Sequence, residues 1–274
     1  MNGLRTLLWF LRRPRLYPEL LRRARRKLAA GTNAASSEDA TKARSDARAW
    51  DESLAVATDV ALERLLGARP KTGFHERHAQ ELAAAEQRAR ACTVRMGGAG
   101  NVDLLFELVE GLAATRVIET GVALGWSSLA VLLAMEPRAD ARLVSVDMPY
   151  PRRDSDAFVG CVVPERLRAH WNLLAYADRE GLPRALRLLP EIDLCHYDSD
   201  KSYDGKRWAY PKLWSALRPG GLFVSDDIGD DAGFRDFCQS LGRTPVVVRS
   251  AATRGAKFVG VLVKPTDASA NHGG

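Results

Sequence analysis

The stretch that decides the fold is VIETGVALGWSSLAVLLAM, residues 117–135. It begins as a short apolar run, passes through a turn that contains Gly121 and Gly125, and continues as an apolar run of helical length. A strand, a glycine-containing turn and a helix in direct succession are the unit from which sheets of parallel strands and covering helices are built. The stretch therefore predicts an α/β fold with a ligand-binding turn after this strand.

The turn has the properties of a site for a zwitterionic ligand. Gly121 and Gly125 allow the backbone to approach a ligand closely, because glycine has no Cβ. The helix N-terminus offers unpaired amide donors to a carboxylate, and Glu119 at the strand end can bind an ammonium group. The donors lie near Trp126, Ser127 and Ser128. One acid and one donor-rich helix end match a ligand with an amino-acid moiety.

The glycine spacing distinguishes between nucleotide cofactors. The turn reads Glu-x-Gly-x-x-x-Gly, with Ala123 in place of a further glycine, so it lacks the Gly-x-Gly-x-x-Gly pattern of dinucleotide-binding turns. This disfavours a nicotinamide cofactor. Asp147 ends the next predicted strand, where a carboxylate can accept hydrogen bonds from both ribose hydroxyls of a nucleotide. Enzymes with nicotinamide use the same device, so Asp147 indicates a ribose without identifying the cofactor.

Short β-rich runs alternate with segments of helical pattern along the chain. The predicted strands are residues 116–120, 141–147, 171–176, 192–198 and 221–227, followed by a hairpin of 244–250 and 257–264. Such alternation implies a parallel sheet covered on both faces. We predict a Rossmann-like, seven-stranded, mostly parallel sheet with a C-terminal antiparallel hairpin. Residues 50–66 and 75–92, with apolar residues at three- and four-residue spacings, predict an N-terminal helical cap.

Three motifs in order give the chain a resemblance to a known family. They are ETGVALGWSS (119–128), SVDMPY (145–150) and HYDSDKSYDGKRWAYPKLWSALRPGGLFVSDD (196–227). In these residues the chain resembles class I S-adenosylmethionine-dependent methyltransferases, especially the bacterial metal-dependent O-methyltransferases that tailor sugars and secondary metabolites. It is also similar to catechol- and caffeoyl-type O-methyltransferases. The resemblance implies that S-adenosylmethionine binds at the turn and that Asp178 contacts its adenine amine.

Acidic residues follow two predicted strands at the same edge of the sheet. The fourth strand leads to Asp198 and Asp200, and the fifth leads to Asp226 and Asp227. The carboxyl ends of parallel strands line the ligand crevice, so these acids are expected to converge. A hard divalent cation such as Mg²⁺ or Mn²⁺ would relieve their repulsion. By the resemblance, the metal ligands are Asp198, Asp226 and Asp227, and the metal orients a substrate hydroxyl and lowers its pKa.

The general base is expected directly after the fourth strand. Lys201 stands where catechol-type relatives have a lysine, and Asp200 resembles the acid of the Asp-x-Asp motif in sugar-tailoring relatives. The commoner motif of that group has histidine at the position of Lys201, and this departure leaves the proton path open. His196 is an alternative base, although its place inside a strand is equally typical of a hydrogen-bonded core residue.

Positive charge is concentrated at the N-terminus. Residues 1–30 contain nine basic side chains against Glu19 alone, a net charge of +8, whereas the whole chain carries +6 and the remainder therefore −2. A slightly acidic remainder argues against nucleic-acid binding. Leucine and aromatic residues among the arginines indicate peripheral contact with an anionic membrane face or an acidic partner, although Pro14 and Pro18 interrupt a continuous helix. No apolar run approaches the roughly 20 residues that cross a bilayer.

Composition divides the chain into five segments. They are a basic amphipathic arm (1–30), a flexible linker (31–48), the helical cap (49–100), the methyltransferase domain (101–264) and a frayed tail (265–274). The four cysteines form no disulfide or zinc pattern, so we expect a cytoplasmic protein, with the arm at the inner membrane face. A homo-oligomer is compatible with the sequence.

The sequence thus predicts an O-methyltransferase that acts on a hydroxyl of a small molecule or glycan, because such a metal site helps when an oxygen needs activation. Three other functions are open. A nicotinamide-dependent oxidoreductase would share the sheet but lacks the glycine signature. A metal-dependent hydroxylase of the same fold family would share the acidic motifs and require iron and oxygen. A nonenzymatic protein would use the basic arm to dock on lipid or an acidic partner.

Overall fold

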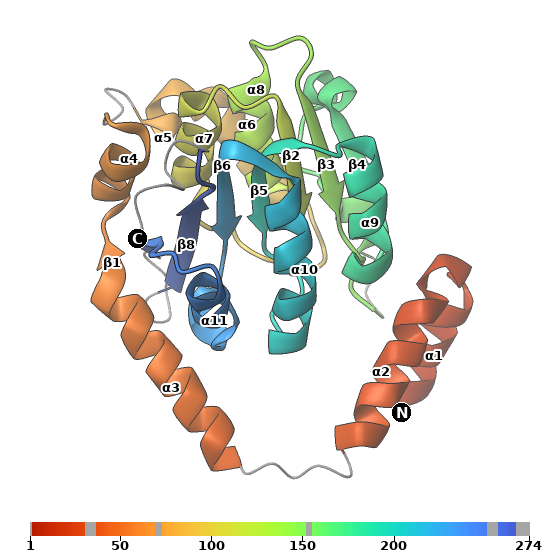
Figure 1. Cartoon of the computed structure of the whole chain (residues 1–274). Helices are drawn as coiled ribbons and strands as arrows, with labels where there is room; N and C mark the ends of the chain where they lie inside the picture. Colours follow the sequence, from red (N-terminus) through yellow and green to blue (C-terminus); the bar gives the residue numbers. More distant parts are fainter. Residues whose placement is uncertain (1, 31–36, 69–72, 152–154, 251–256, 267–274) are drawn as a thin grey trace.

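The strands of the protein form one eight-stranded mixed sheet in the order β1-β7-β8-β6-β5-β2-β3-β4 (Figure 1). The structure is a computed structural model that describes residues 2–30, 37–68, 73–151, 155–250 and 257–266. The strands are β1 (Ala55–Val56), β2 (Arg116–Thr120), β3 (Arg142–Val146), β4 (Trp171–Leu174), β5 (Ile192–Tyr197), β6 (Leu217–Ser225), β7 (Val246–Ser250) and β8 (Lys257–Val263). Neighbouring strands are parallel except that β8 is antiparallel to both β6 and β7. The predicted Rossmann-like sheet and C-terminal hairpin are confirmed.

Helices cover both faces of the sheet, because successive side chains of a buried strand point to opposite sides. On β2, Val117 belongs to one hydrophobic cluster and Ile118 to the other. The first cluster includes α4 (Thr58–Leu66), α5 (Phe74–Arg77), α6 (Ala79–Arg90), α7 (Val102–Gly111) and α8 (Trp126–Met135). The second includes α3 (Ser37–Leu54), α9 (Asp178–Leu188), α10 (Tyr203–Ala216) and α11 (Gly233–Ser240).

The eighth strand was not predicted, and it divides a helix expected over residues 50–66. Helix α3 ends at Leu54, Ala55 and Val56 pair with β7, and α4 begins at Thr58. The pairing is parallel, with Ala55 opposite Val247. It gives hydrogen-bond partners to the edge of β7, which would otherwise present unpaired backbone groups. Helical periodicity alone does not reveal this interruption, because the need for it arises in the sheet.

Much of the segment expected to be a flexible linker is helical. Residues 37–48 belong to α3, and alanine and charged residues of this kind are good helix formers. Contacts with the folded part hold the helix, since Ala47 is buried and the guanidinium of Arg44 lies 3.1 Å from the carboxylate of Asp230. The prediction of a linker was therefore wrong for these residues. Residues 31–36 of the linker and 267–274 of the tail lie outside the described residues.

The basic arm is a helical hairpin of α1 (Asn2–Leu11) and α2 (Tyr17–Ala30), joined by the short 3₁₀ helix η1 (Pro14–Leu16). Pro14 stands at the first position of η1, where proline needs no backbone hydrogen bond. The break therefore falls at the first predicted proline, whereas Pro18 lies in the first turn of α2. None of the helices in the described part of the chain has the length and apolar character that a membrane-spanning helix requires.

Candidate active site

The turn after β2 touches the end of the neighbouring strand β5. Gly121 and Gly125 have φ angles of 85° and 94°, which favour glycine. A Cβ on Gly121 would lie 2.1 Å from the backbone oxygen of Asp198. Ala123 lies between the two glycines with a φ of 50°, a strained conformation for a residue with a Cβ. The close approach of the turn to β5 therefore depends on Gly121 having no side chain.

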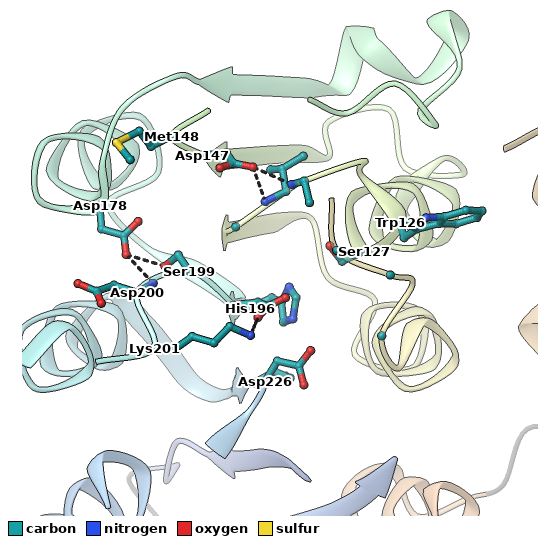
Figure 2. Close-up of a pocket in the computed structure, with 18 of the residues that line it drawn as sticks. Trp126, Ser127, Asp147, Met148, Asp178, His196, Ser199, Asp200, Lys201 and Asp226 are labelled. Atoms are coloured by element: carbon teal, nitrogen blue, oxygen red, sulfur yellow. Dashed lines mark hydrogen bonds and ion pairs between the residues drawn. The ribbon is translucent and has the colours of Figure 1, made fainter. Parts of the chain in front are cut away.

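Asp147 fastens the turn to the end of β3. Its Oδ2 atom accepts hydrogen bonds from the backbone N–H groups of Val122 and Ala123 at 2.9 and 2.7 Å (Figure 2). This leaves Oδ1 without a donor among the described residues. Of the two oxygens needed for the predicted bidentate contact with a ribose, only Oδ1 is therefore free. Burial raises the pKa of Asp147 to about 6, against the lowering effect of the two N–H groups.

Glu119 lies beneath the turn and not at the ligand surface. Its side chain is fully buried, and Oε2 accepts hydrogen bonds from Ser128 Oγ at 2.5 Å and Ser145 Oγ at 2.7 Å. The Oε1 atom faces Nδ1 of His196 at 3.5 Å. Direct binding of a ligand ammonium, predicted for Glu119, does not fit this position, because protein groups surround the carboxylate. The same contact directs Ser128 inward, away from the ligand.

Glu119 and His196 face each other in the protein interior, and each shifts the pKa of the other. Burial by itself would raise the pKa of Glu119, but the nearby His196 and the serine hydroxyls hold it below its ordinary value. Burial would lower the pKa of His196, but Glu119 raises it. His196 also lines the cavity above this pair. Of the two roles considered for His196, the position facing Glu119 favours the buried core residue, although the 3.5 Å separation is an ion-pair distance and both facing atoms lack a hydrogen-bond partner among the described residues.

A large cavity of about 1180 Å³ runs along the carboxyl edge of the sheet (Figure 2). It is lined by most of the predicted cofactor, base and metal residues, namely Gly121, Trp126, Ser127, Asp147, Asp178, Asp198, Asp200, Lys201 and Asp226. The cavity does not reach Glu119, Gly125, Ser128 or Asp227. Gly125 instead packs against Gly160, whose Cα atom would lie 2.8 Å from an added Cβ. The predicted site residues thus divide into a lining group and a supporting group.

Asp178 and Asp200 lie together on one side of the cavity. Asp178 Oδ2 accepts hydrogen bonds from Ser199 Oγ at 2.5 Å and from the N–H of Asp200 at 3.4 Å (Figure 2). Burial raises the pKa of Asp178 to about 6. Asp200 Oδ1 accepts hydrogen bonds from the N–H and hydroxyl of Ser202, the residue that caps α10. One oxygen of Asp200 is therefore engaged in holding the start of this helix.

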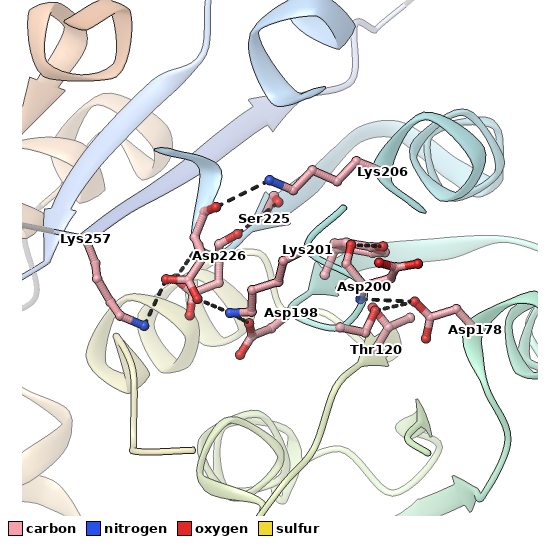
Figure 3. A network of polar contacts seen from close by, with 12 residues as sticks. Thr120, Asp178, Asp198, Asp200, Lys201, Lys206, Ser225, Asp226 and Lys257 are labelled. Carbon is pink, nitrogen blue, oxygen red and sulfur yellow. Dashed lines mark hydrogen bonds and ion pairs between the residues drawn. The ribbon is translucent and has the colours of Figure 1, made fainter. Parts of the chain in front are cut away.

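The acids after β5 and β6 are joined by lysines (Figure 3). Lys201 Nζ lies 2.8 Å from Asp198 Oδ1 and also bonds to Asp227 Oδ2, while Lys257 Nζ lies 2.9 Å from Asp227 Oδ1. Burial, followed by the charge of nearby Asp226, raises the pKa of Asp198, against the lowering effect of Lys201. Negative charge that was expected to attract a metal is thus matched by ammonium groups.

The described residues do not fit the predicted three-acid metal site. Asp198 and Asp226 line the cavity, but both carboxylate oxygens of Asp227 are bonded to lysines. Over the described part of the chain, no three carboxylate, histidine or cysteine side chains are grouped closely enough to hold a metal ion. The sequence pattern correctly predicted that the three acids lie at one edge of the sheet. It could not show that Lys201 and Lys257 would bond to Asp227.

Several lining residues have no counterpart in the sequence prediction. They include Glu19 and Arg23 from the arm, Met148 after β3, the segment 97–101 before α7, and Lys257 at the start of β8. The glycine cluster in 97–101 offered a signal, because glycines outside regular elements often lie close to ligands. Glu19 offered none, since its approach to the cavity depends on how the arm folds back.

Comparison with known proteins agrees with this geometry. Residues 118–228, which run from β2 through β6, match the family model of a methyltransferase domain. This segment is thus similar to a methyltransferase domain, and the sheet has the Rossmann-like arrangement of the class I fold. The match covers less than half of the chain and includes the turn and the acids Asp147, Asp198, Asp200, Asp226 and Asp227. No curated protein matches the chain.

Solved structures share the fold of the methyltransferase domain at low sequence identity. An O-methyltransferase from Bacillus cereus in complex with SAH has a TM-score of 0.52 and 15% identity, covering 78% of this chain and 100% of that one. A putative O-methyltransferase from Klebsiella pneumoniae has a TM-score of 0.51 and 18% identity, covering 78% of this chain and 99% of that one. Cofactor-bound Rv0187 from MTB has a TM-score of 0.51 and 20% identity, covering 69% of this chain and 89% of that one. These likenesses establish the architecture of the domain.

Proposed function

We propose that the protein is an O-methyltransferase that transfers the methyl group of S-adenosylmethionine to a hydroxyl of a small molecule or glycan. The observation that carries the proposal is that one cavity contains both Asp147 with the glycine turn and the acid–lysine group of Asp198 and Lys201. A nucleotide-type cofactor and a polar acceptor could therefore meet in the same space. The sulfonium cofactor bound at the turn would supply the methyl group.

Cofactor binding is assigned to the β2, β3 and α9 side of the cavity. The free oxygen of Asp147 would accept a hydrogen bond from a ribose hydroxyl. Asp178 would accept a hydrogen bond from the exocyclic amine of adenine. The turn at Gly121 lets the backbone approach, and Trp126 and Ser127 at the start of α8 offer amide donors to the carboxylate of the methionine moiety. The Bacillus cereus fold relative, a complex with SAH, supports this choice of cofactor.

Acceptor chemistry is assigned to the end of β5. Lys201 would bind and orient the acceptor oxygen, and Asp198 is placed beside it to take the hydroxyl proton. The oxygen then attacks the methyl carbon in line, so that an O–C bond forms as the C–S bond breaks and the sulfonium becomes a neutral thioether. Alignment of two bound reactants can lower the barrier by roughly 7 to 11 kcal/mol. No step of this proposal passes through a metal ion, because both carboxylate oxygens of Asp227 are bonded to lysines.

Calorimetry with purified protein tests the cofactor assignment. S-adenosylmethionine and its demethylated product should bind, whereas NAD should not. A screen of cell extracts with labelled methyl donor should then give a labelled small molecule or glycan. Binding of NAD without S-adenosylmethionine would favour the oxidoreductase, and iron-dependent consumption of oxygen would favour the hydroxylase. Transfer of the label to protein or nucleic acid would contradict the acceptor class.

A second proposed function, contact with an anionic membrane surface, rests on the exposed face of the arm. Five of its large apolar residues are exposed, namely Leu7, Leu8, Leu11, Tyr17 and Leu21. Among them stand four exposed arginines that make no ion pair with another described side chain, namely Arg5, Arg12, Arg15 and Arg25. Apolar side chains next to unpaired cations are suited to the boundary between lipid headgroups and acyl chains. We refer to these nine residues as the outer face of the arm.

A further inference from the structure

The inner face of the arm packs against residues that border the cofactor side of the cavity. Trp9, Phe10 and Leu16 form a small buried cluster, against which Leu20 and Met148 pack. Met148 follows Asp147 directly and lines the cavity. The arm thus covers the residue next to the proposed ribose ligand with apolar side chains, and exposure of this cluster to water would be unfavourable. This contact gives the arm a fixed place beside the site.

Two ion pairs also join the arm to the rest of the protein. The guanidinium of Arg22 makes a two-pronged contact with the carboxylate of Glu180 on α9, with both N···O distances at 2.6 Å. Arg13 contacts Asp156, at the start of the short 3₁₀ helix η2 (Asp156–Phe158), at 2.9 Å. The Arg22 and Glu180 side chains are only 23% and 18% exposed, and paired hydrogen bonds between charged groups of this geometry are the stronger kind. Glu180 lies two residues after Asp178, the proposed adenine ligand.

Two side chains of the arm reach the cavity itself. Glu19 and Arg23 line it together with Asp147, Met148 and Asp178. Glu19 is only 8% exposed, and its two oxygens accept hydrogen bonds from Arg22 at 3.0 Å and Arg23 at 2.7 Å. A buried carboxylate oriented by two arginines keeps further lone pairs as acceptors for a ligand donor. Such donors are present on a nucleoside, as ribose hydroxyls and an exocyclic amine.

We propose that the helical hairpin of the arm, from residue 5 to residue 25, forms the outer wall of the nucleoside end of the cofactor site. Glu19 is its polar contact, and Arg22 is the positioning residue that holds the wall in place through Glu180. This inference rests on the proposed cofactor, and it goes beyond the methyltransferase domain, whose family match begins at residue 118. Since the arm docks where the cofactor binds, docking and cofactor binding stabilise one another.

Calorimetric titration of the full chain with S-adenosylhomocysteine tests whether the arm contributes to cofactor binding. Arg22→Ala and Glu180→Ala should each weaken binding by about three- to tenfold, as expected for loss of a partly buried, paired ion contact. Arg25→Ala is the matched control, because Arg25 lies on the same helix but is exposed and unpaired among the described residues, and its affinity should equal that of the original protein. The charge exchange Arg22→Glu with Glu180→Arg should recover part of the loss. Circular dichroism checks that each variant is folded.

Limited digestion with trypsin gives a second readout that does not depend on activity. The cofactor product should slow cleavage at the arginines of the arm in the original protein and have a smaller effect in Arg22→Ala. If Arg22→Ala and Glu180→Ala bind the product as well as the original protein does, the arm does not form a wall of the cofactor site. The proposed function would still stand in that case. If the original protein binds neither S-adenosylmethionine nor its product, the proposed function itself fails.

Discussion

Lys201 and Asp198 are joined at 2.8 Å, and the same ammonium group also bonds to Asp227, so one lysine connects the acids that follow β5 and β6 (Figure 3). Three acids so close together would repel one another if they were all ionised and unpaired. The lysine supplies the positive charge that keeps them together at the cavity wall. The fold therefore has its own means of stabilising an acidic cluster at the proposed acceptor site.

Replacement of Lys201 should affect the chemical step much more than cofactor binding. We expect Lys201→Ala to lower kcat about 100-fold or more, because the acceptor oxygen and its proton lose the group that orients them. The affinity for S-adenosylmethionine should change less than about twofold, since Lys201 lies away from Asp147. Initial rates with labelled methyl donor and calorimetric titration measure the two effects. Lys212→Ala, an exposed lysine on α10, is the control and should leave both unchanged.

Methyl transfer should persist when divalent cations are removed. Because both oxygens of Asp227 are bonded to Lys201 and Lys257, the three acids do not present a complete set of oxygen ligands. Dialysis against a chelator should therefore leave more than half of the initial rate. Loss of activity that Mg²⁺ or Mn²⁺ restores would contradict this prediction, and it would show that the lysines give way to a metal bound by Asp198 and Asp226.

The parts of the site that depend on local sequence were predicted well. The run from Arg116 to Thr120 is rich in β-branched residues, and it is followed by Gly121, so the strand and the start of the turn could be located to the residue. Glu119 shows the limit of this reasoning. Its partners Ser145 and His196 come from β3 and β5, and only the pairing of three strands reveals that the carboxylate is enclosed.

Contacts between distant segments were the least predictable. Arg22 and Glu180 are separated by 158 positions, and neither residue has a local pattern that names the other as its partner. The basic composition of the arm suggested a separate segment that binds elsewhere. In the structure its inner face packs against the domain, so the charge pattern described only its outer face.

The affinity for S-adenosylmethionine should fall as the pH decreases through about 6. Burial raises the pKa of Asp147 to about 6, and the protonated carboxyl is the weaker acceptor for a ribose hydroxyl. Binding therefore favours the ionised form, which is lost below this pH. Calorimetric titrations between pH 5 and 8 would show the dependence. Asp147→Asn should bind more weakly at pH 7.5 and show a flatter profile, with Asp178 accounting for what pH dependence is left.

The stability of the unliganded protein should respond to Asp147 in the opposite direction. Its pKa in the folded state, about 6, lies above the ordinary value of 3.8, so the folded state binds more protons between these limits. The contribution of Asp147 to the free energy of unfolding therefore decreases as the pH rises from about 4 to about 6 and is constant above that. Urea unfolding of the original protein and Asp147→Asn at both pH values measures it. An equal difference between the two proteins at both pH values would contradict the raised pKa.

Gly121→Ala should destabilise the protein by about 3 kcal/mol or more, because a Cβ there would lie 2.1 Å from the backbone oxygen of Asp198. Its positive φ adds a smaller cost of about 1 kcal/mol. Gly67→Ala separates the two effects, since Gly67 has a φ of 76° but no atom within 4 Å of the added Cβ. Urea unfolding should show a much larger loss for Gly121→Ala. Equal losses would mean that the turn can move away from β5.

Binding of the outer face of the arm to anionic lipid should depend on both its apolar and its basic residues. Leu7→Glu with Leu11→Glu should abolish cosedimentation with vesicles that contain phosphatidylglycerol, because two exposed apolar contacts become negative charges. Arg12→Ala with Arg15→Ala should weaken binding about tenfold or more, at about 1 kcal/mol for each charge near the surface.

The matched control for this surface is Leu188→Glu, since Leu188 is 52% exposed, close to the 51% of Leu11, but lies at the end of α9. It should bind vesicles as the original protein does. Binding to phosphatidylglycerol should weaken as salt is added, and vesicles of phosphatidylcholine alone should bind poorly, because both results follow from attraction between arginines and anionic headgroups. Equal binding to both kinds of vesicle would leave only the apolar contact. No binding to either, with capture of a soluble acidic protein instead, would assign the outer face of the arm to a protein partner.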